Sequence, residues 1–107
     1  MMNKTLGLLS LCRKAGRLKM GADACLEAAA GGGARLILYA NDLSAKTKAG
    51  LERGFSGLTD PPPRVQTQLT MFDFSQVCGK LTGVVAVADD GFARGLQDLI
   101  CAENKEE

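Results

Sequence analysis

Two runs of consecutive apolar residues constrain this chain of 107 residues more than any other feature. They cover residues 35–40, after one leading charge, and residues 83–88. A strand with one face in water alternates apolar and polar residues, whereas a strand covered on both faces is apolar throughout. Both runs therefore predict buried strands of a sheet that carries helices on its two faces.

The segments between these runs predict the helices. Asn3 or Thr5 can cap a first helix that ends at Gly16, and the Ala-rich residues 21–30 predict a second helix that three glycines end. Ser44 can cap a third helix, from Ala45 to about Arg53, which Gly54 ends. Thr70 can cap a short fourth helix that ends at Gly79. Residues 17–20 predict a brief strand, and residues 64–69 predict a half-exposed edge strand after a loop over residues 54–63 with three prolines.

The last helix shows the clearest amphipathic pattern. Phe92, Leu96, Leu99 and Ile100 form one apolar stripe after a cap at Asp89 or Asp90, and residues 101–107 are expected to fray into an acidic tail. Helices that alternate with buried strands are typical of an α/β protein, here a three-layer α-β-α sandwich. We expect one domain over residues 1–107.

Composition narrows the chemistry. The chain has no His, so it lacks the usual acid–base group near neutral pH and any His-based metal site. Its four cysteines form no C-x-x-C pair, lie in apolar stretches and are expected to be buried free thiols. With no recognisable signal peptide or membrane span, the sequence predicts a cytoplasmic protein without cofactor or metal and without enzymatic activity.

Charge is divided unevenly along the chain. Residues 1–54 hold nine Lys or Arg against four acids, and residues 55–107 hold four against eight. The densest basic segment, residues 13–19, precedes the predicted helix that begins after Gly21. A helix start offers free N–H groups and the positive end of its dipole, so we expect this positive edge to receive a phosphate backbone.

Several short motifs follow one another in a specific order: residues 6–8, 13–18, Gly21, 34–38, 41–44, 47–48, 78–80, 84–87 and 90–93 with Leu96. Their order and spacing resemble the L-seven-Ae family of ribosomal proteins, within the L-thirty-e superfamily of kink-turn-binding proteins, and especially its small bacterial YlxQ-like branch. The resemblance covers about residues 6–96. It implies a mixed four-stranded sheet and non-enzymatic binding of structured RNA, such as ribosomal or other non-coding RNA, with ribosome-associated proteins as further partners.

The resemblance also implies where RNA would bind: the start of the second helix, the loop after the first buried strand and the loop before the second. The basic segment adds phosphate contacts. The candidate RNA-binding residues are Arg13, Lys14, Arg17, Lys19, Gly21, Ala22, Asp23, Ala24, Glu27, Asn41, Asp42, Ser44, Lys48, Lys80 and Leu81.

The second helix departs from the family pattern. Kink-turn binders have Gly, any residue, Asn, Glu, two residues and Lys, where this chain has Gly21, Asp23, Ala24 and Glu27. Asp23 lacks amide donors, Ala24 cannot accept a hydrogen bond from a base, and Glu27 reverses a charge. The sequence therefore favours RNA binding in general over kink-turn recognition.

Two alternatives remain open. The three substitutions are compatible with a protein-interaction module that kept the fold and lost RNA binding. Asp42 and the pair Asp89-Asp90 follow the two buried strands, where a small α/β enzyme could hold phosphate or magnesium. No phosphate-loop or dinucleotide fingerprint supports the second alternative.

Overall fold

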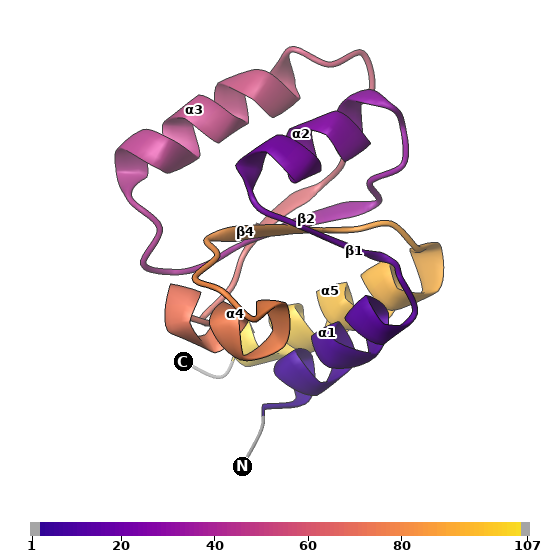
Figure 1. Cartoon of the computed structure of the whole chain (residues 1–107), viewed down its shortest axis with the longest axis vertical. Coiled ribbons are helices and arrows are strands. Elements are labelled where there is room, and N and C mark those ends of the chain that lie inside the picture. The colour runs from indigo at the N-terminus through magenta and orange to yellow at the C-terminus, as the bar shows by residue number, and fades with distance from the viewer. Residues whose placement is uncertain (1–2, 106–107) are drawn as a thin grey trace.

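The computed structural model describes residues 3–105 as an α-β-α sandwich (Figure 1). Its elements in chain order are α1 (Lys4–Lys14), β1 (Leu18–Met20), α2 (Ala22–Ala30), β2 (Leu36–Tyr39), α3 (Ala45–Ser56), β3 (Arg64–Gln66), α4 (Met71–Cys78), β4 (Val84–Val87) and α5 (Asp90–Lys105). The strands form one sheet in the order β1-β4-β2-β3. Because β4 is antiparallel to β1 and β2 while β2 and β3 are parallel, the sheet is mixed, as expected.

The two apolar runs form the central strands. Every residue of β2 and β4 is buried, since α2 and α3 cover one face of the sheet and α1, α4 and α5 cover the other (Figure 1). Alternate side chains of each strand enter opposite layers: Leu36 and Leu38 join the core beneath α1, α4 and α5, whereas Ile37 and Tyr39 join the core beneath α2 and α3. The prediction of strands covered on both faces is confirmed.

Capping residues set most helix starts as predicted. The Asn3 side chain accepts from the Thr5 N–H at 2.7 Å, and Ser44 Oγ accepts from the Thr47 N–H at 3.2 Å. Thr70 and Asp73 form a reciprocal capping box at α4. Asp89, rather than Asp90, caps α5 by accepting from the Phe92 N–H at 2.9 Å.

Four local predictions are wrong, the first being the strand expected over residues 64–69, which ends at Gln66. The helix expected to stop at Gly54 continues to Ser56, because Phe55 is fully buried and Gly54 lies against Leu26 instead of ending the helix. The tail expected to fray from residue 101 is helical to Lys105, where Glu103 accepts a hydrogen bond from Thr5 Oγ1 at 2.8 Å; residues 106–107 lie outside the described part. Cys12, Cys25 and Cys78 are buried, but Cys101 is exposed.

Over residues 3–105, none of the helices combines the length and the apolar character that crossing a bilayer requires.

Candidate nucleic-acid interface

Three chain segments meet at one end of the sheet because β4 runs antiparallel to both of its neighbours. The Gly21 N–H, just after β1, donates to the Val84 carbonyl at 3.0 Å, and the Ala40 N–H, just after β2, donates to the Gly83 carbonyl at 2.9 Å. Gly83 allows this approach, since a Cβ there would lie 2.5 Å from Leu43 Cδ1. The fold thus brings together the start of α2, the loop after β2 and the loop before β4.

The start of α2 is open. Gly21 precedes the helix with φ +94°, a conformation that side chains other than glycine rarely adopt, and it supplies no side-chain cap. The first N–H groups of the helix, at Ala22, Asp23 and Ala24, therefore point toward the end of the sheet without a capping oxygen from Gly21.

The polar side chains of the loop after β2 form hydrogen bonds within the protein. Asn41 donates through its backbone to Leu69 at 2.7 Å and through its amide to the Gln68 carbonyl at 3.1 Å. Asp42 Oδ1 accepts from the Met71 N–H at 2.8 Å, which stabilises the start of α4, and Ser44 caps α3. These three side chains hold the loop in place, and their predicted RNA contacts stay a prediction.

The loop before β4 presents a cation and an apolar side chain together. Gly79 ends α4 with φ +79°, and the buried Thr82 hydroxyl donates to the Lys80 carbonyl at 3.0 Å, which stabilises the turn. Lys80 is exposed, and Leu81 is 67% exposed although it is large and apolar. A rigid turn with an exposed apolar tip suits contact with an unstacked base.

The basic segment is spread along the edge strand instead of being gathered at the start of α2. Arg13 Nη1 donates to the Val77 carbonyl in the last turn of α4, so this guanidinium stabilises a helix end. Lys14 and Arg17 lie beyond the other end of β1 from Gly21, where the Ala88 N–H donates to the Arg17 carbonyl at 2.8 Å. Lys19 lies on β1 itself, between Arg17 and Gly21.

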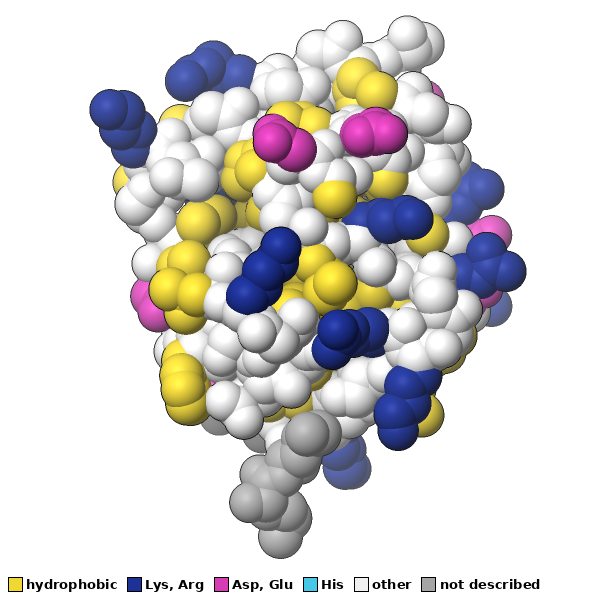
Figure 2. Space-filling view, viewed as in Figure 1, with side chains coloured by type: hydrophobic (Ala, Val, Ile, Leu, Met, Phe, Trp, Pro, Cys, Tyr) yellow, Lys and Arg dark blue, Asp and Glu magenta, His cyan; other side chains and the backbone are white. Residues whose placement is uncertain are grey.

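We call the exposed cations Lys14, Arg17, Lys19 and Lys80 the basic band. Within the part of the chain that the structure describes, none of the four forms an ion pair or a side-chain hydrogen bond. Figure 2 shows Lys and Arg side chains scattered across the face that carries β1, α1 and α4, with apolar side chains between them. This face combines free positive charge with an unpaired strand edge.

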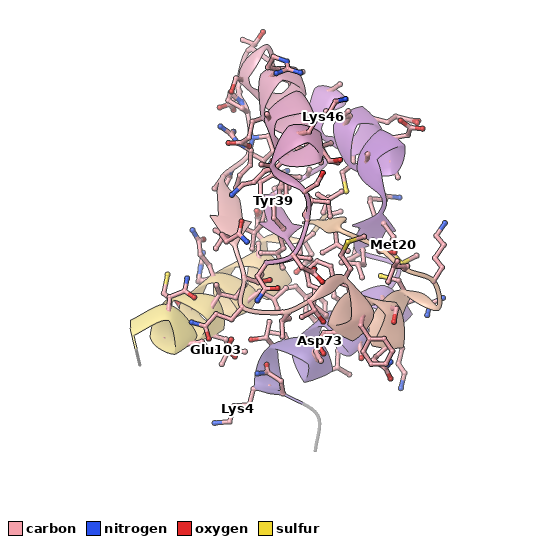
Figure 3. The ribbon with its side chains drawn as sticks, turned by 90° about the vertical axis from the view of Figure 1, so that its left-hand side faces the viewer. Lys4, Met20, Tyr39, Lys46, Asp73 and Glu103 are labelled. Atoms are coloured by element: carbon pink, nitrogen blue, oxygen red, sulfur yellow. The ribbon has the colours of Figure 1, made fainter. Side chains whose placement is uncertain are left out.

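Lys48 lies outside this face. Its Nζ donates to Gln66 Oε1 on β3 at 2.7 Å and lies 5.3 Å from the centre of the Tyr39 ring. β3 is the edge of the sheet opposite β1, so the structure separates Lys48 from the basic band. Figure 3 shows Lys46 extending outward from α3, also at a distance from Met20 on β1.

Two acids lie on α2 next to the basic band. Asp23 and Glu27 are both exposed, and Figure 2 shows acidic side chains over α2. Glu27 and Lys19 line one shallow hollow of about 380 Å³ whose other walls are Ala24, Ala28, Gly31, Gly33 and Ala88. The positive and the negative surfaces therefore meet along the groove between α2 and β1.

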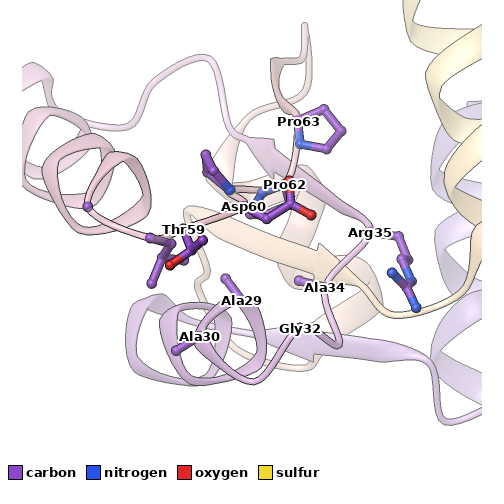
Figure 4. Close-up of a pocket in the computed structure, with 12 residues that line it drawn as sticks. Ala29, Ala30, Gly32, Ala34, Arg35, Thr59, Asp60, Pro62 and Pro63 are labelled. Atoms are coloured by element: carbon purple, nitrogen blue, oxygen red, sulfur yellow. The ribbon is translucent and has the colours of Figure 1, made fainter.

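A larger cavity lies at the end of the sheet opposite the start of α2. A cavity of about 500 Å³ separates the turn after α2 from the proline loop, with Thr59, Asp60 and Pro62 facing Ala29, Ala30 and Gly32 (Figure 4). Its walls carry Asp60 and Arg35, and Arg35 Nε lies 3.4 Å from Asp90 Oδ1. Small residues and prolines dominate this cavity.

The titratable groups whose pKa values are raised are buried. Burial raises the pKa of Cys25, whose thiol lies 3.7 Å from the Lys19 carbonyl, to about 12, and burial raises the pKa of Cys12 to about 11. Burial and a hydrogen bond to Glu52 also raise the pKa of Tyr39. These thiols stay protonated near neutral pH, which does not suit a nucleophile.

The carboxylates considered for magnesium do not meet. Because β2 and β4 are antiparallel, Asp42 and the Asp89-Asp90 pair lie at opposite ends of the sheet. No group of three or more metal-ligating side chains occurs within residues 3–105.

Two large exposed apolar residues were not predicted from the sequence, Leu11 on α1, which is 55% exposed, and Phe72 on α4. Phe72 is 66% exposed in the first turn of α4. The buried residues Phe74, Val77 and Cys78 define the inner face of this helix, and their spacing places Phe72 outside it. The spacing of these apolar residues in the sequence would have been sufficient to predict that Phe72 is exposed.

Comparisons with known proteins identify the fold. No protein-family model and no curated protein matches the sequence. Among solved structures, a protein of unknown function from Bacillus halodurans is 27% identical with a TM-score of 0.80, over 92% of this chain and 97% of that one. A 15.5kD RNA binding protein from Giardia lamblia is 17% identical with a TM-score of 0.68, over 94% of this chain and 84% of that one.

Proposed function

We propose that this protein binds structured RNA, without catalysis, through the basic band together with Leu81 and the start of α2. One observation carries the proposal: the fold joins the open start of α2 and the Lys80-Leu81 turn at one end of the sheet, and cations that the protein does not use internally continue from there along β1. The unpaired Lys and Arg are suited to phosphate oxygens, and the free N–H groups of α2 are suited to a base edge or a ribose hydroxyl.

The comparisons are consistent with this proposal. The Giardia protein shares the fold over nearly the whole chain and is an RNA-binding protein. Together with the order of motifs, this favours membership of the L-seven-Ae family and its YlxQ-like branch, with a ribosomal or other non-coding RNA as the ligand in the cytoplasm. Leu81 would contact an unstacked base, while the basic band would contact the backbone.

Kink-turn recognition is a narrower part of the proposal. A kink-turn contains sheared G·A pairs whose edges a protein must read with donors and acceptors. Ala24 offers neither, and Asp23 offers acceptors only. We therefore expect binding to a folded RNA to depend more on the basic band than on these pairs.

The test is fluorescence anisotropy with a labelled kink-turn RNA and a control RNA whose sheared G·A pairs are replaced, each at two salt concentrations. We expect salt-dependent binding that the double variant Lys14→Glu/Arg17→Glu weakens at least about tenfold, since it removes two phosphate contacts and adds two repulsions. The matched control Lys46→Glu/Arg94→Glu makes the same charge change on α3 and α5 and should alter affinity less than about threefold.

The protein-interaction module is the second candidate, and Asp23 and Glu27 are the observation that favours it. An acidic surface on α2 would suit a basic protein segment. Absence of binding to both RNAs at low salt would contradict RNA binding and favour this candidate. Equal loss of affinity in the two charge-reversal variants would show that the basic band is not the contact surface.

A further inference from the structure

We infer that Asp23 and Glu27 form a phosphate-excluding face on α2 that confines the RNA backbone to the basic band. This inference rests on the proposed RNA binding and specifies how the same surface orients its ligand. It assigns the two acids a specificity role: a base edge or a ribose hydroxyl can approach α2, and a phosphate cannot.

The placement of the two acids supports this role. They are four residues apart on a helix, so they lie on the same side of α2, and both are exposed. Within residues 3–105, neither acid forms an ion pair or donates or accepts a side-chain hydrogen bond. Their negative charge is therefore directed at solvent and at any ligand.

The groove between α2 and β1 brings this charge to the edge of the basic band. Glu27 and Lys19 line the same hollow, and the alanines 24, 28 and 88 leave no long side chain between them. The two groups do not come within ion-pair distance, since the described residues form only the Arg35–Asp90 and Arg64–Glu52 pairs. A backbone lying along β1 would thus pass a cation on one side and a carboxylate on the other.

The two carboxylates of α2 outweigh the positive end of its helix dipole, so the net charge there repels phosphate. The start of a helix carries about half a positive charge, whereas the two carboxylates carry two negative charges within the first two turns. A pair of unit charges about 4 Å apart in water changes affinity by roughly fivefold, and the effect falls off over about 8–10 Å at moderate salt. The net field beside α2 therefore repels phosphate, and the cations of β1 and α1 attract it.

A purely structural role explains only one of the two acids. Asp23 lies in the first turn of α2, where a carboxylate stabilises the helix dipole. Glu27 lies beyond the first turn and has no such benefit, and its carboxylate has no partner among the described residues. Glu27 is therefore the residue on which the inference depends most.

The experiment compares Glu27→Gln and Asp23→Asn/Glu27→Gln with wild type in RNA titrations over a range of salt. The matched control is Asp60→Asn/Asp98→Asn, which removes two exposed acids from the proline loop and from α5. We expect the α2 double variant to bind about three- to tenfold more tightly at low salt, with Glu27→Gln giving at least half of the gain on a logarithmic scale. The control should change affinity less than about twofold.

A charge-reversal variant separates exclusion from simple neutralisation. Glu27→Lys places a cation where a phosphate could then bind, so the slope of log affinity against log salt should steepen by about one unit. Glu27→Gln should raise affinity with little change in slope, because it adds no phosphate contact. Thermal unfolding of each variant checks that α2 is intact.

Two results would overturn the inference while RNA binding stands. One is a gain no larger than that of the control. The other is a loss of affinity in Glu27→Gln, which would mean that the carboxylate accepts hydrogen bonds from the RNA. If wild type itself binds no RNA and Lys14→Glu/Arg17→Glu changes nothing, the proposed function fails and this inference fails with it.

Discussion

The two helical layers pack on the same sheet with different kinds of side chain. The lower layer, α1, α4 and α5, covers a core of large residues that includes Leu9, Phe74, Leu96 and Ile100. The upper layer, α2 and α3, covers a smaller core, and five of the nine residues of α2 are alanine. The difference indicates that the lower layer supplies most of the buried apolar surface, while small side chains let α2 lie close to the edge strand.

The basic band lies where the two layers meet along β1, with Lys14 on a lower-layer helix and Glu27 on an upper-layer helix. At this edge of the sheet, the cations lie on α1, on or just before β1, and in the loop before β4, whereas the two acids lie on α2.

Core truncation should give the largest effect. Leu96→Ala in the lower layer removes a fully buried side chain from the larger cluster, and we expect it to lower the free energy of unfolding by about 3–4 kcal/mol. Leu51→Ala, its matched partner in the upper layer, should cost about 2–3 kcal/mol. Urea denaturation of both variants measures the difference, and a larger cost for Leu51→Ala would contradict the contrast between the layers.

The close approach of α2 and α3 should give the next largest effect. A Cβ at Gly54 would lie 2.8 Å from Leu26 Cδ2, whereas a Cβ at Gly50 would come no closer than 3.8 Å to the Arg53 side chain. Gly50→Ala should stabilise α3 by about 0.5–1 kcal/mol, and Gly54→Ala should be about 1 kcal/mol less favourable than that.

Leu26 provides the control for the glycine comparison. In a Leu26→Ala background the contact is gone, so Gly54→Ala should recover the stabilisation that Gly50→Ala shows. Equal effects of the two glycine substitutions in the wild-type background would mean that α2 and α3 do not pack closely in solution.

Alkaline pH should weaken the fold through its buried thiols. Burial raises the pKa of Cys12 from 9.0 to about 11, so between these values the unfolded chain loses a proton that the folded chain keeps. Fewer protons on the unfolded state mean that stability is complete below about pH 9 and falls as pH rises toward 11. The free energy of unfolding, measured from pH 8 to pH 11, should fall less steeply in Cys12→Ala than in wild type.

Thiol labelling gives the smallest perturbation and compares the layers directly. With a thiol reagent at pH 8, Cys101 should react at once because it is exposed, and the other three cysteines should react only after local opening. Variants that retain Cys25 alone or Cys12 alone then report the upper and the lower layer. We expect Cys25 to label faster, and faster labelling of Cys12 would reverse the proposed order of stability.

Local patterns in the sequence account for much of the fold. Continuous apolar runs predict β2 and β4, and the caps at Asn3, Ser44, Thr70 and Asp89 predict the starts of four helices. These features depend on neighbouring residues, so a local pattern is sufficient to predict them. The end of α3 was predicted wrongly, because Gly54 packs against Leu26, a residue far away in the sequence.

The candidate interface depended on features that a local pattern does not contain. Strand direction placed Gly21 and Gly83 at one end of the sheet, and it placed Asp42 and Asp89 at opposite ends. Packing engaged Arg13 with Val77 and Lys48 with Gln66, and it left the basic band free. Local sequence thus specifies the residue types and the elements that they form. Which charges meet depends on strand order and on contacts between distant residues, because these set the positions of the side chains.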